Sequence, residues 1–320
     1  MDASTALNSY LRGFNHSHDE WPAEAPYDPS LAWWAALPWS SDRATSWTMI
    51  TEAMPQLRLP QQAGISQSEL YRQLVLRGVA PPEAMLIPSS GIFKQPEELQ
   101  LRLVEHPYAA MPVLSTSNRE DFLWLVRALA HRAEPVAIEA GVHAQAISGL
   151  IHWGMIRCLG PGQRASLILL HEAPYGSVPS KDLPINLNSH EWIQASYTLR
   201  LEHELTHLTT KQVLGEMRLN LLDELIADAM GHLMALGQFS ALVFDRCLEQ
   251  RWRAYVAELN EEEAQWVLDL TRDRAQELEV ALSPWQGATP VRKQLLPWLC
   301  RLRLDQAIEK LAPHPQANSE

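Results

Sequence analysis

Apolar residues recur three and four positions apart through most of the second half of the chain. This spacing predicts amphipathic helices, and an Asn or Ser before each apolar stretch and a Gly after it mark the helix ends. We expect successive helices over residues 190–214, 221–236 and 239–250, a further helix that begins after Asn260, and a last one over 292–311 that is interrupted near Pro297.

The first half of the chain is more interrupted. Capping boxes of the form Ser-x-x-Glu at residues 66–69 and 117–120 predict a short helix that ends before Gly78 and a longer one that reaches about Arg132. Residues 139–153 are also expected to form a helix. The apolar run Ser166–His171 has turn residues on both sides and predicts a strand. The expected fold is therefore mainly α, of the α+β class, with a small β-sheet beside the helix over 190–214.

Tryptophan and proline are concentrated in the first sixty residues, where so many prolines exclude a long helix. Large indole rings most often pin an irregular segment onto a core, but they also anchor partners or line grooves. We expect residues 1–115 to form a separate lobe or an extended wrap and residues 116–320 to form a second domain. The tryptophans in question are Trp21, Trp33, Trp34, Trp39 and Trp47.

Composition narrows the range of partners and compartments. The chain has 320 residues, of which 46% are apolar, and this is enough to bury a full core. Its formal net charge of −12 argues against nucleic acid or an anionic membrane as the main partner. The sequence contains no signal-peptide pattern, no apolar run of membrane-spanning length and no Cys-x-x-Cys pair. These features predict a reduced, cytoplasmic protein.

The chemistry is concentrated in residues 199–231, which read LRLEHELTHLTTKQVLGEMRLNLLDELIADAMG. The stretch contains the motif HExxH. His203 and His207 are four residues apart and leave the same helix face one turn apart, which is the spacing that two ligands of one Zn²⁺ need. Glu204 lies about 100° round the helix from His203. It can therefore act as a general base on metal-bound water without being a ligand.

Two acidic residues interrupt the apolar helix that follows, and buried carboxylates are costly unless they are paired or bind a metal. Zinc that serves hydrolysis takes three protein ligands, and two His with one Glu is a standard set. We therefore expect Glu224 to be the third ligand and Asp228, four residues later, to accept the outer N–H of a metal-bound His. Gly231 would let another element approach that face. In the alternative, both His are ordinary helix residues and both acids point to water.

The motifs HELTH and DELIAD together resemble the gluzincin branch of zinc metallopeptidases, with its thermolysin-like pattern HExxH…ExxxD. The resemblance covers residues 199–231. It implies that His203, His207 and Glu224 bind zinc, that Glu204 is the catalytic base and that Asp228 orients a zinc-bound His. The stretch is also similar to uncharacterised bacterial proteins that carry HELTH and NLLDELIAD.

Gluzincins usually also present a His or Tyr that stabilises the tetrahedral oxyanion, and no motif of this chain matches that group. Tyr197 lies on the helical line of Glu204, two turns away, and His232 shares a helix face with Asp228. For each candidate, an ordinary position in the core or on the surface is the more common reading. The candidates are Tyr197, Tyr175, His190 and His232.

The expected activity is zinc-dependent cleavage of peptide bonds in a peptide or protein substrate. Glu204 would take a proton from the attacking water and deliver it to the leaving amine. The strand at residues 166–170 is either a sheet edge along which an extended peptide aligns or an ordinary buried strand. Two other functions would use the same metal site. One is a regulatory or binding protein that retains the metal without peptidase activity, and the other is an enzyme that modifies a peptide rather than cleaving it.

Overall fold

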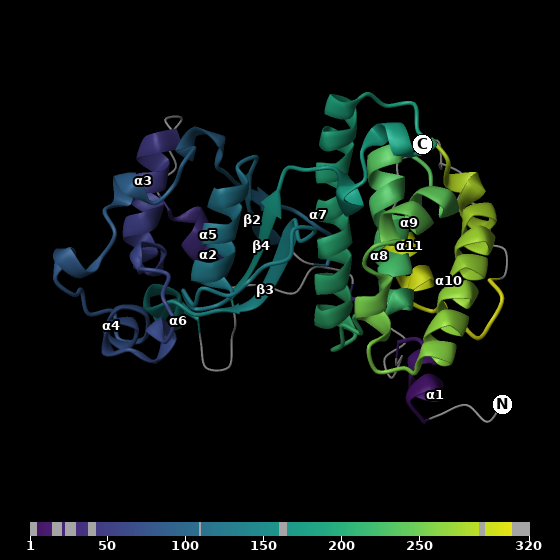
Figure 1. Cartoon of the computed structure of the whole chain (residues 1–320), viewed down its shortest axis with the longest axis horizontal. Coiled ribbons are helices and arrows are strands. Elements are labelled where there is room, and N and C mark those ends of the chain that lie inside the picture. The colour runs from purple at the N-terminus through teal and green to yellow at the C-terminus, as the bar shows by residue number, and fades with distance from the viewer. Residues whose placement is uncertain are drawn as a thin grey trace. The chain divides into compact units, whose positions relative to one another are not determined.

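The computed structural model describes residues 5–14, 21–22, 30–37, 43–108, 110–159, 165–287 and 292–308 (Figure 1). The chain divides into two compact units, of which unit 1 comprises residues 1–24 and 173–320 and unit 2 comprises residues 25–172. These limits differ from the domain boundary expected near residue 115. Strands on both sides of residue 115 pair in one sheet, so both belong to the same unit.

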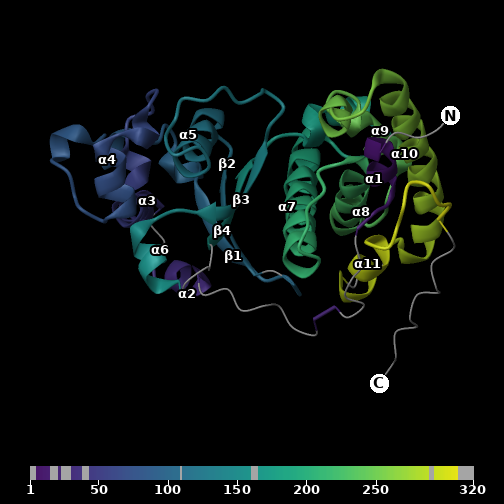
Figure 2. The same ribbon diagram turned by 90° about the horizontal axis from the view of Figure 1, so that it is seen from below.

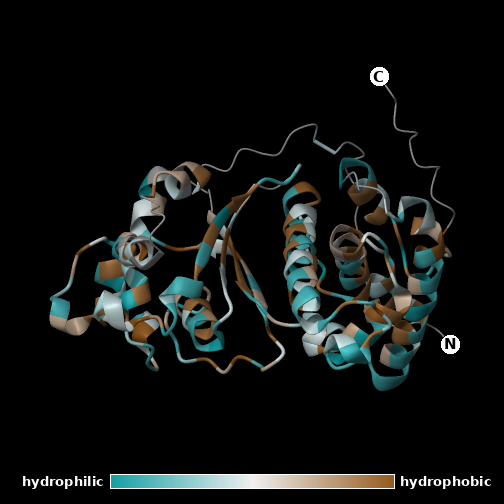
Figure 3. Cartoon of the chain, turned by 90° about the horizontal axis from the view of Figure 1, so that it is seen from above, coloured by the Kyte–Doolittle hydropathy of each residue, from teal (hydrophilic) through white to brown (hydrophobic). Residues whose placement is uncertain are grey.

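Unit 2 is built around a four-stranded mixed sheet of order β1-β2-β4-β3. Its strands are β1 (Gln100–Val104), β2 (Met111–Thr116), β3 (Ala144–Leu150) and β4 (Ala165–His171). Strands β2 and β4 run parallel, and the two outer pairs are antiparallel. Helix α5 (Arg119–Leu129) lies beside the sheet in Figures 1 and 2, and its buried apolar residues belong to the same cluster as those of the strands. Strands β2 and β4 are buried along nearly their whole length, and hydrophobic residues dominate the sheet in Figure 3.

One expectation about this unit is wrong, and one pair of alternatives is decided. Residues 144–150 form strand β3 instead of the central part of a helix over 139–153. Pairing with the buried strand β4 overrides the local helical pattern, and Gly149 lies where the register shifts between Ile147 and Leu150. The predicted strand β4 is confirmed, but it pairs on both sides and is not a sheet edge. It therefore offers no free backbone groups to an extended peptide, and the alternative of a buried strand is correct.

Unit 2 contains further α-helices, which contribute either to this core or to a second buried cluster around Leu59, Ile65 and Tyr71. They are α2 (Ser30–Ala35), α3 (Arg43–Ala53), α4 (Glu69–Tyr71) and α6 (Trp153–Cys158). Trp34 on α2 and Trp47 on α3 are buried in the same cluster as the sheet residues, which confirms the packing role for these two rings. Trp39 lies outside the described residues.

Unit 1 contains the helices of the second half and one short N-terminal helix. They are α1 (Thr5–Leu11), α7 (Ser189–Val213), α8 (Leu221–Leu236), α9 (Ala241–Leu248), α10 (Glu261–Leu282) and α11 (Arg292–Leu299). Asn188, Asn220 and Asn260 cap α7, α8 and α10 with their side chains, which confirms the predicted helix starts. The fold is thus mainly α with a small mixed sheet. Because that sheet and α7 belong to different units, their adjacency stays a prediction.

Among the helices of the described residues, none is by itself long and apolar enough to cross a membrane. Helices α8 and α9 reach that length and composition only when taken together, and the chain bends by 119° between them.

His152 gives unit 2 a predicted sensitivity to acid. Its imidazole is buried against Trp33, with ring centroids 5.7 Å apart, and burial lowers its pKa to about 4. An unfolded His titrates near pH 6.5, so between about pH 6.5 and 4 the unfolded chain binds a proton that the folded chain does not. The contribution to stability is complete above this window and is lost as the pH falls through it.

We expect the free energy of unfolding to fall by about 2 kcal/mol more between pH 7 and pH 5 in the wild type than in a His152→Phe variant. Urea unfolding curves at the two pH values measure the difference. His190 is exposed, so a His190→Phe variant should keep the wild-type pH dependence. An equal loss of stability in the wild type and the His152→Phe variant would contradict the prediction.

Candidate metal centre

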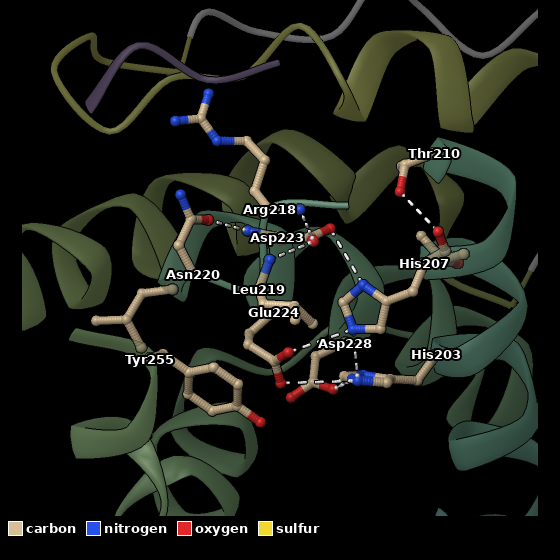
Figure 4. A network of polar contacts seen from close by, with 12 residues as sticks. His203, His207, Thr210, Arg218, Leu219, Asn220, Asp223, Glu224, Asp228 and Tyr255 are labelled. Carbon is tan, nitrogen blue, oxygen red and sulfur yellow. Dashed lines mark hydrogen bonds and ion pairs between the residues drawn. The ribbon is translucent and has the colours of Figure 1, made fainter. Parts of the chain in front are cut away.

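The centre is formed by helices α7 and α8, which pack tightly against each other. Helix α7 begins with a capping box between Asn188 and Glu191 and carries the HExxH motif past its midpoint. Gly231 on α8 lies directly under α7, and a Cβ atom there would come within 2.8 Å of the carbonyl oxygen of Leu199. The glycine therefore permits the close approach expected from the sequence. Both motif imidazoles point toward α8 (Figure 4).

Three buried side chains bring their donor atoms together between the two helices. The Nε2 atoms of His203 and His207 lie 3.0 Å apart. Glu224 Oε1 lies 3.2 Å from Nε2 of His207, and Glu224 Oε2 lies 3.6 Å from Nε2 of His203. None of the three residues is more than 5% exposed. This group can hold a metal ion, and it unites the three ligands expected from the sequence.

Each imidazole has its own aspartate on the opposite ring nitrogen. Nδ1 of His203 lies 2.6 Å from Asp228 Oδ1, as predicted, and Nδ1 of His207 lies 3.1 Å from Asp223 Oδ1. A carboxylate at Nδ1 favours a proton on that nitrogen and leaves the lone pair on Nε2. Two Nε2 lone pairs that face each other at 3.0 Å repel unless a cation lies between them. The tautomers that the aspartates favour are therefore those of metal ligands.

The charges of the centre leave room for a divalent cation. The guanidinium of Arg251 lies 3.4 Å from Glu224 Oε2 and 3.4 Å from Asp228 Oδ2. Together with Asp223, the three carboxylates and this single guanidinium carry a net charge of −2 when both His are neutral. Such a charge is costly in a buried site unless it is balanced. A divalent metal ion restores neutrality, so the donor set fits the ion in charge as well as in geometry.

Without a metal, protons and Arg251 must provide this balance. Burial lowers the pKa of His207, but Asp223 and Glu224 outweigh it and raise that pKa well above its ordinary value. Burial likewise opposes ionisation of Glu224, yet His203, His207 and Arg251 lower its pKa to about 2. Asp228 behaves in the same way, and its pKa is held well below the usual range. Glu224 and Asp228 thus stay ionised at neutral pH and attract a cation.

Tyr175 lies on the outer side of the centre, next to His203 and Asp228. Its hydroxyl hydrogen-bonds Asp228 and lies 3.0 Å from Nδ1 of His203, on the side of the ring that faces away from Nε2. The guanidinium of Arg251 donates to the same hydroxyl at 3.1 Å. Tyr175 is therefore placed to support His203 and Asp228 from outside, and this position does not suit an oxyanion donor.

The other residues singled out from the sequence take different positions. Glu204 is half-buried on α7 and lies near Arg200. Burial lowers the pKa of the Arg200 guanidinium to about 10, and the negative charge of Glu204 opposes that shift. His190 is exposed at the start of α7, about 20 Å along the helix from the motif. Tyr197 is half-buried on α7, two turns before Glu204. His232 is fully buried beside Phe239, and burial lowers its pKa to about 4.

Sequence reasoning missed Asp223, Arg251 and Tyr255 as parts of the centre. Tyr255 belongs to the short 3-10 segment η9 (Trp252–Val256), and its ring points toward Glu224 in Figure 4. Arg251 donates to the Tyr255 hydroxyl at 3.4 Å. Burial raises the pKa of Tyr255, and the charge of Glu224 adds to the shift. Asp223 was recognisable only as the third residue of its helix, and the other two lie in a segment without a motif.

Comparison with known proteins gives a family and no activity. No curated protein and no solved structure matches the chain. The model of one family matches residues 4–160 and 163–306, and thus includes both units and every residue of the centre. The chain belongs to the family of unknown function DUF7005.

Proposed function

We propose that this protein is a zinc-dependent hydrolase of the gluzincin type, which acts on peptide bonds in the cytoplasm. The observation that carries the proposal is the convergence of His203, His207 and Glu224 in a buried centre with a net charge of −2. Tetrahedral zinc with bonds of about 2.0–2.1 Å separates its ligand atoms by roughly 3.3 Å. The observed separations of 3.0, 3.2 and 3.6 Å agree with that value.

His203, His207 and Glu224 would hold the zinc, which would supply a polarised water and a Lewis acid for the scissile carbonyl. Glu204 follows His203 directly and is not one of the three ligands, so we assign it as the general base. Its carboxylate takes a proton from the attacking water and passes that proton to the leaving nitrogen. Asp223 and Asp228 keep both imidazoles in the tautomer that binds metal.

We assign Tyr255, whose ring faces Glu224, as the donor for the oxygen of the scissile carbonyl. Its raised pKa keeps the phenol protonated at neutral pH, so the hydroxyl can donate as negative charge develops on that oxygen. Arg251 fixes the ring through its contact with the hydroxyl. This assignment replaces the four candidates from the sequence with a residue that faces the third ligand.

The test of the proposal is metal analysis together with a cleavage assay on the whole chain. Purified protein should contain one zinc per chain by mass spectrometry, and a peptide library should show cleaved products that disappear on chelation and return with added zinc. Absence of stoichiometric zinc would overturn the proposal.

One observation favours a second function, that of a regulatory or binding protein with a retained metal. The three ligands are nearly inaccessible to solvent, which limits the access of a peptide to a metal ion bound there. One zinc per chain without any cleaved product would select this alternative. A product of increased mass in the same library would instead indicate modification of the peptide.

The second aspartate provides a quantitative test of the metal site. An Asp223→Asn variant keeps the size of the side chain but removes the charge beside Nδ1 of His207. Loss of such an outer partner costs roughly 10–100-fold in metal affinity. We expect that loss in a zinc titration against a chromophoric chelator. Asp273 is exposed on α10, so an Asp273→Asn variant is the matched control. Equal affinities of the two variants would refute a role for Asp223.

A further inference from the structure

The N-terminal segment of residues 5–14 belongs to the unit that carries the metal centre. Leu7, Tyr10 and Leu11 are buried on one face of α1, and Phe14, just beyond the end of the helix, is buried as well. Figures 1 and 2 both show α1 among the helices of unit 1. Gly13 has a left-handed φ of 73°, and a Cβ atom there would lie 2.7 Å from the carbonyl oxygen of Leu302. The segment is therefore seated closely on the rest of unit 1.

Tyr10 connects this segment to both elements that surround Glu224. Its hydroxyl accepts a hydrogen bond from the backbone N–H of Leu221 at 2.8 Å and donates one to the carbonyl oxygen of Tyr255 at 3.0 Å. The residue is only 1% exposed. Leu221 is the first residue of α8, and the first N–H groups of a helix have no partner within it. The Tyr10 hydroxyl thus accepts from an N–H group at the start of α8 and holds the segment of Tyr255 against this end of the helix.

The two segments that Tyr10 joins both contribute side chains to the centre. Helix α8 carries Glu224 one turn after Leu221, whereas η9 carries Tyr255 and directly follows Arg251. The bonds of Tyr10 fix the backbone of one segment relative to the other. They therefore set the distance at which the side chains of Arg251 and Tyr255 meet Glu224.

A second contact of the same segment ends at the other aspartate. The guanidinium of Arg218 donates to the carbonyl oxygen of Ser9 at 2.6 Å. The backbone N–H groups of Arg218 and Leu219 donate to Asp223 Oδ2 at 2.9 and 3.1 Å. Asp223 in turn faces His207. Ser9 directly precedes Tyr10, so this contact helps to seat Tyr10 and also links the N-terminal segment to a second side of the metal centre.

We propose that Tyr10 is a positioning residue of the metal centre, which holds Glu224 on α8 in register with Arg251 and Tyr255 on the following segment. The inference rests on the proposed metal-binding function. It makes the N-terminal segment a component of a site whose ligands lie some two hundred residues later in the chain.

The test compares Tyr10→Phe with Tyr71→Phe in the full chain. Tyr71 is also buried, but it lies in unit 2, so its variant controls for the loss of a buried hydroxyl. Cobalt(II) replaces zinc as the probe, because its visible spectrum reports the geometry of the ligands. For Tyr10→Phe we expect a shifted cobalt spectrum and a dissociation constant for zinc raised by roughly tenfold or more, as for other outer partners of a metal site. Tyr71→Phe should match the wild type in both measurements.

Thermal unfolding of each variant separates positioning from a general loss of stability. A lowered midpoint with an unchanged cobalt spectrum and zinc affinity would overturn the inference, as would equal changes in both variants. If Tyr10→Phe does not fold, Arg218→Ala replaces it, and a two- to fivefold weaker zinc affinity is expected because 1 kcal/mol corresponds to about fivefold. Unchanged affinity in that variant overturns the inference. A wild-type chain that binds neither metal would instead reject the proposed function, and the inference with it.

Discussion

Replacing Glu204 with glutamine is expected to lower turnover of a cleaved peptide by about 10²–10⁴-fold, which is the usual contribution of a general base. Glutamine has nearly the same shape but cannot take a proton from water. Among the described residues, Glu204 forms no hydrogen bond or ion pair with the three ligands, so zinc content should stay at the wild-type level. Initial rates and metal analysis on the same preparation measure the two effects.

Glu202, two residues earlier on the same helix, provides the matched control. Its buried carboxylate accepts two hydrogen bonds from Arg292, at 2.7 and 2.8 Å. A Glu202→Gln variant should therefore lose about 1–3 kcal/mol of unfolding free energy and keep its turnover. If Glu204→Gln retains full activity, or if both variants lose activity equally, Glu204 is not the base.

Replacing Gly231 with alanine is expected to separate the two helices that carry the ligands. The added Cβ would lie 2.8 Å from the carbonyl oxygen of Leu199 and 3.1 Å from its Cδ2. A backbone carbonyl cannot rotate away, so α7 must move outward. Overpacking of this kind costs about 1–3 kcal/mol. The imidazoles of His203 and His207 would then move away from Glu224. Each 1.4 kcal/mol of strain that opposes metal binding lowers zinc affinity about tenfold.

Urea unfolding and zinc titration measure the two consequences. Gly91 has open space around it, so a Gly91→Ala variant in unit 2 controls for the added methyl group. We expect that control to match the wild type in both measurements. A Gly231→Ala variant with wild-type stability and affinity would show that the helices tolerate a wider separation than the ligand geometry suggests.

The parts of the site that could be predicted from the sequence are those fixed by local geometry. The spacing of His203 and His207 requires only a helix, and the caps at Asn188 and Asn220 define where the two helices begin. Pairing of Asp223 with His207 depends instead on the register between α7 and α8. Arg251 and Tyr255 enter from an irregular segment, where no period links residue type to position.

The fold was predictable to a similar degree. Strand β4 has an apolar run bounded by turns and was predicted, whereas β3 forms where local signals favour a helix. Its strand conformation follows from pairing with β4, a contact that no local pattern encodes. The grouping of residues 5–14 with the second half of the chain is likewise a tertiary contact, made through Tyr10 and its neighbours.

The discontinuity of unit 1 has a consequence for biosynthesis. All of unit 2 leaves the ribosome between Tyr10 and the elements to which this tyrosine bonds. At roughly 5–20 residues per second, Tyr10 waits on the order of ten to fifty seconds for Tyr255 to be made. The complete centre can therefore bind a metal ion only late in the synthesis of the chain. A nascent chain that stalls between Glu224 and Tyr255 contains all of unit 2 and all three ligands, but it cannot close the site around them.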